Sequence, residues 1–347
     1  MSRFKSLKTF TQKYIGTPSH FQRKTYGGFL FCAVLVVILL SLSLYYYLSD
    51  DSASISDSSH LSEVMANVTP TSGIGGGSII GNSKAGNKDL PIYCVDIASK
   101  IKQGTAGSDA SKNQESISDS NSNENTSTSD SEPNKNPSTD FQSDKKYVSL
   151  SFDAAWGDED TIQILDILDK YNVKVTFFMT GGWVESYPDK VKEIYARGHD
   201  LGNHSQNHKQ MSKLDVAGQK EELLSVGTKV KELTGYDMFL FRPPYGDYNS
   251  TLITTAYGCN YYPIQWSVDS LDWKDYGVDK IVERVTKNKS LDNGAIILMH
   301  NGAKFTADAL ESVITSLQEQ GYTLVPISQL IIKENFHMDG TGKQIAD

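Results

Sequence analysis

The sequence contains few cysteines, three in 347 residues. Three are too few for a disulfide-stabilised scaffold, and none has the CxxC spacing of a zinc site or a thiol redox site. Cys32 lies within a long apolar run, so Cys94 and Cys259 are the two that could pair. We expect both to remain free thiols.

Positive charge is also scarce. Lysine and arginine total 33 against 42 aspartates and glutamates, which gives a formal net charge of −9 at pH 7. A protein that binds nucleic acid normally presents a basic surface to the phosphates, so the composition argues against nucleic acid as a partner. The sequence has no fixed-period repeat either, and its length suits one large domain or two small ones with attachments.

An apolar run without charge extends over residues 29–48. About 20 such residues can cross a bilayer as a helix. Six basic residues precede the run and two aspartates follow it, and basic residues stay on the cytoplasmic side. We therefore predict a single-pass signal anchor at residues 28–48, with residues 1–27 cytoplasmic and the rest extracellular. A cleaved signal peptide is the alternative, but no small-residue cleavage site follows the run.

Two stretches after this run are dominated by small and polar residues. Residues 49–88 are rich in serine, glycine and asparagine, and residues 104–144 consist almost wholly of polar and charged residues. Such segments cannot bury enough apolar surface to offset their chain entropy. We expect the first to be a flexible tether and the second to be a disordered insertion.

Residues 90–101 lie between these two stretches and are apolar and β-branched, which indicates a strand. They form either an isolated segment of the tether or the first strand of the folded domain. In the second interpretation, which we favour, residues 90–95 pair with residues 147–152. The polar stretch is then a long insertion at the tip of that hairpin, which costs little stability. The folded domain would cover residues 89–336, followed by a C-terminal tail at residues 337–347.

From residue 147 onward, short apolar runs alternate with amphipathic runs. Alternation of this kind predicts a parallel sheet with right-handed helical crossovers, and seven strands suit a closed or partly closed (β/α) barrel. Strands are predicted at residues 147–152, 173–178, 200–203, 238–241, 260–265, 295–299 and 322–325. Helices are predicted at residues 161–170, 189–197, 216–233, 250–257, 278–287 and 307–320.

Chemically distinctive side chains follow the ends of these predicted strands. Barrel enzymes build their active sites at the rim formed by the carboxyl ends of the strands. We therefore expect the distinctive residues to share one rim. They are Asp153, His204, His208, Arg242, Tyr245, Asp269, Asp272, Trp273 and His300.

His204 and His208 are four residues apart. In a helical turn this spacing places both rings on one face, where they could share one metal ion. Two surface histidines are the alternative. His300 ends a buried strand and is either a core histidine or a catalytic acid that needs a carboxylate partner, for which Asp272 is the candidate. Arg242 could brace a carboxylate or form an ordinary surface ion pair.

Five short motifs occur together and in order: SFDAAWG, HSQNH, RPPY, DSLDW and LMH, which begin at residues 151, 204, 242, 269 and 298. In this order they resemble the polysaccharide deacetylases of carbohydrate esterase family four, the NodB-homology domain. The resemblance extends from about residue 90 to residue 332. It implies a distorted (β/α) barrel that removes N-acetyl groups from an amino-sugar polymer with the help of a divalent metal ion.

The resemblance also implies roles for individual residues. Asp153 would be the general base, oriented by Arg242. His300 would protonate the departing amine under the influence of Asp272, and the backbone N–H of Tyr245 would help to hold the oxyanion.

The same resemblance implies the metal ligands and the walls of the pocket. His204 and His208 would bind the ion, with zinc expected and cobalt, nickel or manganese as alternatives. Trp273 and Leu298 would shape the pocket for the acetyl methyl group.

One position departs from the family pattern. The family usually has a second acid after the base, as third metal ligand, but this chain has Ala154 there. Three explanations stay open. Asp158, or Asp160 if it is not a helix N-cap, reaches back as the third ligand. Alternatively, the two histidines hold the ion loosely, with water or Asp153. In the third explanation the domain has lost catalysis and only binds glycan.

The anchor and tether suggest a polymer of the cell wall as the substrate, with peptidoglycan as the expected one. A non-catalytic glycan-binding module and an O-acetyl esterase of the acetylxylan type are the alternative functions. The sequence does not predict the oligomeric state.

Overall fold

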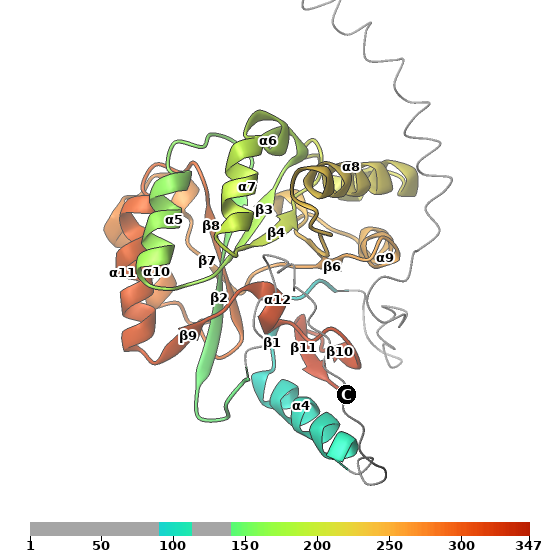
Figure 1. Ribbon diagram of the computed structural model, residues 1–347, viewed down its shortest axis with the longest axis vertical. Coiled ribbons are helices and arrows are strands. Elements are labelled where there is room, and N and C mark those ends of the chain that lie inside the picture. The colour runs from blue at the N-terminus through green and yellow to red at the C-terminus, as the bar shows by residue number, and fades with distance from the viewer. Residues whose placement is uncertain (1–89, 113–139) are drawn as a thin grey trace, which may run out of the picture. The chain divides into compact units, whose positions relative to one another are not determined.

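The computed structural model describes residues 90–112 and 140–347 (Figure 1). The predicted membrane anchor at residues 28–48 and the predicted tether at residues 49–88 lie outside this part. No helix within the described ranges is long and apolar enough to cross a membrane.

The centre of the fold is the long strand β2, Lys146–Ala154. It pairs in parallel with β8, Ala295–His300, along one edge. Its other edge pairs in parallel with β9, Tyr322–Leu324, near its start and with β3, Thr176–Met179, near its end. The parallel order continues from β3 to β4, Asp200–Asn203, then β5, Leu240–Phe241, and β6, Tyr262–Pro263.

The six predicted helices are confirmed, each to within one residue at either end. They are α5, Thr161–Lys170; α7, Pro188–Ala196; α8, Val216–Thr234; α9, Ser250–Gly258; α10, Val278–Thr286; and α11, Thr306–Glu319. The apolar stripe of α5 is buried as its spacing predicts. Three further helices were not predicted: α4, Ile97–Lys112; α6, Gly181–Ser186; and α12, Ile327–Leu330. The first of these runs into the segment expected to be disordered.

The sheet is mixed, so the expectation of about seven parallel strands is only partly right. Within the described residues, eleven strands form one sheet. The additional ones are β1, Cys94–Val95; β7, Val268–Asp269; β10, Phe336–Met338; and β11, Lys343–Ala346. Strand β1 runs antiparallel to β8 and parallel to β11. Residues 337–347, expected to be a tail, therefore contribute to the sheet.

The predicted pairing of residues 90–95 with residues 147–152 is wrong. Cys94 lies opposite Ala295 of β8 and Lys343 of β11 instead. The physical reason is that β8, β9 and β3 already occupy both edges of β2. Cys94 and Cys259 are both free thiols, as expected.

The sheet curls back on itself through residue 92. Ile92 forms a parallel bridge with Ile264, directly after β6, while β1 two residues later pairs with β8. One apolar cluster, which includes Ile92, Tyr147 and Ile296, fills the inside of the curl. A larger cluster lies between the sheet and the helices that cover its outer face (Figure 1).

Strand β2 sends alternate side chains to these two sides. Leu150, Phe152 and Ala154 belong to the outer cluster. Ser151 and Asp153 therefore point into the curl, and Asp153 does so near the carboxyl end of the strand, as the sequence predicts for a residue of the rim.

Candidate active site

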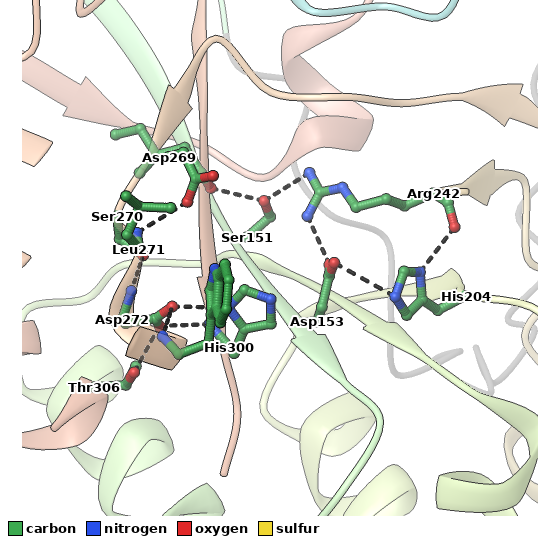
Figure 2. Close-up of polar contacts among 12 residues, drawn as sticks. Ser151, Asp153, His204, Arg242, Asp269, Ser270, Leu271, Asp272, His300 and Thr306 are labelled. Carbon is green, nitrogen blue, oxygen red and sulfur yellow. Dashed lines mark hydrogen bonds and ion pairs between the residues drawn. The ribbon is translucent and has the colours of Figure 1, made fainter. Parts of the chain in front are cut away.

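Asp153 and Arg242 form a buried ion pair (Figure 2). One amino group of the guanidinium, Nη1, lies 2.8 Å from Asp153 Oδ1. The other, Nη2, donates to Ser151 Oγ and to the Gln265 carbonyl. The guanidinium also lies over the Phe178 ring, 4.1 Å from its centroid. Arg242 is thus fixed on several sides and braces Asp153, which excludes an exposed surface ion pair.

The surroundings of Asp153 favour its charged form. Burial alone would raise the pKa of this carboxyl. The Arg242 guanidinium, through its charge and its hydrogen bond, outweighs burial and holds the pKa below its ordinary value of 3.8. Asp153 is therefore a carboxylate at neutral pH, the state that a general base requires.

His204 is held with one ring nitrogen available. Its Nδ1 lies 2.8 Å from the Arg242 carbonyl oxygen, which accepts a hydrogen bond and so fixes the proton on Nδ1. Nε2 then carries a free lone pair and lies 3.5 Å from Asp153 Oδ2. Burial lowers the pKa of His204 to about 4. The ring is neutral, as a metal ligand must be.

The histidine pair does not lie on a helical turn, contrary to the prediction. Residues 204–208 form a loop after β4, and Ser205 and His208 adopt left-handed backbone conformations, with φ of 66° and 52°. The rings of His204 and His208 still meet, with centroids 4.9 Å apart. Tyr245 packs against the other side of His208, with a centroid distance of 4.5 Å.

The two imidazoles suit a divalent metal ion, but a full protein ligand set is not assembled. Among the described residues, no group of three histidine, cysteine or acidic side chains is arranged to hold a metal. The Asp158 carboxylate lies 3.7 Å from Lys190 Nζ. Its role as third ligand stays a prediction.

Asp160 and Ala154 have structural partners of their own. Asp160 precedes α5, but its side chain makes no capping hydrogen bond. It accepts from the Gly302 N–H at 2.8 Å instead. Ala154 is fully buried and lies opposite Met179 of β3. The position that usually carries the third ligand is here part of the apolar packing.

His300, which is partly buried, and Asp272, which is fully buried, form the second pair of the site (Figure 2). His300 Nδ1 lies 2.7 Å from Asp272 Oδ1, and the His300 backbone N–H donates to Oδ2. The Thr306 hydroxyl donates to the same Oδ2 at 2.6 Å. Burial alone would lower the pKa of His300, but the carboxylates of Asp272, Asp153 and Asp269 raise it above 6.5. His300 is thereby suited to act as a proton donor.

Trp156 is a site residue that the sequence reasoning did not single out. Its indole is 46% exposed and stacks on the His300 ring, with centroids 5.8 Å apart. Gly302 permits this approach, because a Cβ at that position would lie 2.4 Å from the Trp156 carbonyl oxygen. The signal in the sequence was the place of Trp156 in the first motif, where it follows Asp153 by three residues at the end of a predicted strand.

The remaining predicted residues also lie around the two pairs. Tyr245 is exposed and has a left-handed backbone, with φ of 61°. Trp273 is half exposed, and its backbone N–H donates to Asp272 Oδ1. Leu298 is buried in β8, two residues before His300. The residues predicted at the strand ends therefore lie around the two pairs.

Comparison with known proteins agrees with this geometry. The family model described as polysaccharide deacetylase matches residues 141–264. An uncharacterized 30.6 kDa protein of Geobacillus stearothermophilus is 36% identical over 55% of this chain and 73% of its own length. A peptidoglycan-N-acetylglucosamine deacetylase of Bacillus cereus is 34% identical over 54% of this chain and 90% of its own length.

Solved structures agree as well. BA3943 of Bacillus anthracis, described as a CE4 family pseudoenzyme, has a TM-score of 0.53 at 34% identity, over 56% of this chain and 68% of that one. A mutant of BA3943 is described as having restored enzymatic activity, and it matches with a TM-score of 0.52 at 35% identity, over 56% and 70%. We conclude that this chain belongs to the polysaccharide deacetylases, carbohydrate esterase family four.

Proposed function

We propose that this chain hydrolyses N-acetyl groups of an amino-sugar polymer of the cell wall, namely peptidoglycan. The observation that carries the proposal is that Asp153, held by Arg242, and His300, held by Asp272, lie opposite each other on β2 and β8. Asp153 has a lowered pKa and His300 a raised one. A base and an acid whose pKa values are pushed apart are the two groups that amide hydrolysis requires.

In this proposal Asp153 accepts a proton from the attacking water, while Arg242 keeps the carboxylate in place. His300 then donates its Nε2 proton to the departing amine, with Nδ1 held by Asp272. The Tyr245 N–H, the first donor after two prolines, stabilises the developing oxyanion. A divalent metal bound by His204 and His208, with zinc the expected ion, would polarise the acetyl carbonyl.

The substrate and the location complete the proposal. A relative carries the name peptidoglycan-N-acetylglucosamine deacetylase. The apolar run at residues 29–48 and the basic residues before it favour a single-pass anchor with the catalytic domain outside the cell. Trp273 and Leu298 would contact the acetyl methyl group.

Acetate release tests the reaction. The full-length protein, supplied with Zn²⁺, should release acetate from purified peptidoglycan, and His300→Ala should not. Matched N-acetyl and O-acetyl oligosaccharides distinguish an amidase from an acetylxylan-type esterase. Faster release from the O-acetyl substrates would contradict the proposal.

A second candidate is a non-catalytic glycan-binding module on the same fold. It is favoured by Ala154 at the usual ligand position, by the lack of a three-residue metal group among the described residues, and by the likeness to a structure described as a pseudoenzyme. Glycan binding that survives a chelator, without acetate release from any acetylated substrate, would select this candidate.

A further inference from the structure

Glu222 of α8 is a buried carboxylate that contacts the histidine loop, which we define as residues 204–209. The residue is 2% exposed. Its Oε2 accepts the Asn207 backbone N–H at 2.7 Å, and its Oε1 accepts the Asn207 side-chain amide at 2.9 Å. Lys209 Nζ lies 2.9 Å from the same Oε1. One side chain thus receives three donors from the segment that carries His208.

The backbone of α8 holds the same region. The Gln206 N–H donates to the Glu222 carbonyl at 3.0 Å. The Asn203 side-chain amide donates to the Leu223 carbonyl at 2.7 Å, and its oxygen accepts the Ser205 N–H. A single turn of α8 therefore fixes the chain both before and after His204.

The histidine loop needs outside support because its own backbone is unfavourable. Ser205 and His208 both have positive φ, a conformation that residues other than glycine rarely adopt. No helical hydrogen bonds place the two rings, since residues 204–208 are not helical. His204 is fixed by the Arg242 carbonyl, whereas His208 makes ring contacts with His204 and Tyr245.

The chemistry of the contact requires a carboxylate. Burial would raise the pKa of Glu222, but the donors from Asn207 and Lys209 hold it below its ordinary value of 4.5. A glutamine at this position would have one acceptor oxygen and an NH₂ group facing donors. At least one donor of the histidine loop would then lose its partner.

We propose that Glu222 is a positioning residue for the metal site, which holds His208 where it can share one ion with His204. The inference rests on the metal-binding part of the proposed function. Ala154 makes the positioning role of Glu222 more important, because Ala154 supplies no third ligand. A site with only two histidine ligands depends more strongly on how well those ligands are preorganised.

The experiment compares full-length wild type, Glu222→Gln and the control Glu221→Gln. Glu221 is the exposed neighbour on α8, so both variants remove one negative charge from the same helix turn. Two quantities are measured: Zn²⁺ affinity by calorimetry, and hydrogen exchange of the Asn207 amide in metal-free protein. We expect Glu222→Gln to weaken Zn²⁺ binding on the order of tenfold and to speed Asn207 exchange. The control should change neither.

Asn207→Ala provides a second variant in case Glu222→Gln does not fold. It deletes one donor to Glu222 at an exposed position and should weaken Zn²⁺ binding by a few-fold. Unchanged affinity in the folded Glu222→Gln or Asn207→Ala protein overturns the inference, as does an equal loss in Glu221→Gln. Wild type that binds no Zn²⁺ overturns it as well. If the wild-type protein binds Zn²⁺ but releases no acetate, the deacetylase proposal is contradicted and the proposed role of Glu222 is unaffected.

Discussion

Asp153 and His300 lie directly opposite each other on the neighbouring parallel strands β2 and β8. Partners in register point to the same face of a sheet, so both side chains face the inside of the curl near its rim. The pKa of one is lowered and that of the other is raised. The strand register thus places a carboxylate and a proton-donating imidazole side by side on one face of the sheet.

Replacement of Asp153 by asparagine should abolish most acetate release and also destabilise the fold. An amide cannot take up the proton of the attacking water, and loss of a positioned base lowers rates by about 10²–10⁴-fold. The variant also leaves the buried Arg242 charge without its counter-ion, which costs about 3 kcal/mol of unfolding free energy. Urea unfolding and acetate assays measure both effects. Ser151→Ala, which removes a neutral partner of Arg242, should cost less stability. Wild-type stability in Asp153→Asn would contradict the role of the ion pair.

The pH profile of kcat/KM should have its alkaline limb above pH 6.5. His300 must be protonated to act, and Asp272 helps to raise its pKa above the ordinary value of 6.5 against the opposing effect of burial. The folded state therefore binds this proton more tightly than the unfolded chain. The resulting stabilisation is complete below pH 6.5 and is lost as pH rises through the folded pKa.

Asp272→Asn tests this origin of the shift. Without the carboxylate, burial should lower the pKa of His300, so the alkaline limb moves to lower pH and the loss of stability at high pH becomes smaller. An alkaline limb that stays in place in Asp272→Asn would show that Asp272 does not set the pKa of His300.

Ala154→Asp should destabilise the metal-free protein and make its stability depend on Zn²⁺. Ala154 is fully buried against apolar residues, and an unpaired polar group in such a place costs about 1–3 kcal/mol. The family resemblance assigns the third metal ligand to this position, so Zn²⁺ should recover the loss. Thermal unfolding with and without Zn²⁺ measures this recovery. A drop in Tm that Zn²⁺ does not reverse would exclude residue 154 as a ligand position in this chain.

Asp158→Asn should change Zn²⁺ affinity by less than about tenfold. The reason is that the two histidine rings already meet without any contribution from the Asp158 carboxylate. The Asp158 side chain lies near Lys190 rather than in a three-ligand group. Calorimetry of the full-length variant beside Lys190→Met, which removes only the cation, measures the change. A larger loss in Asp158→Asn alone would assign the third ligand to Asp158.

Much of the fold follows from local patterns in the sequence. The stripe of Thr161, Ile164, Leu165 and Leu168 predicts α5, and all four side chains are buried. A glycine with φ of 76° ends α8 at residue 235, as its position after the last apolar residue indicates. These signals are local because a helix buries one periodic face and ends where the backbone turns.

Pairing between distant segments was predicted less well. The composition of residues 90–95 suits any free strand edge. The start of β2 offers none, because β9 already pairs with it. The short strands β7, β10 and β11 have little periodicity of their own. Strand β7 pairs with β8, β11 pairs with β1, and β10 pairs in turn with β11.

The sequence by itself predicted which side chains gather at the rim, because parallel strands bring the residues that follow their carboxyl ends to one edge of the sheet. Only the tertiary structure decided their states. It buried Arg242 beside Asp153, placed Asp272 against His300, set the rings of His204 and His208 together without a helix, and packed Ala154 among apolar residues. Proton affinity and ligand geometry depend on burial and on neighbours far away in sequence, and those exist only once the chain has folded.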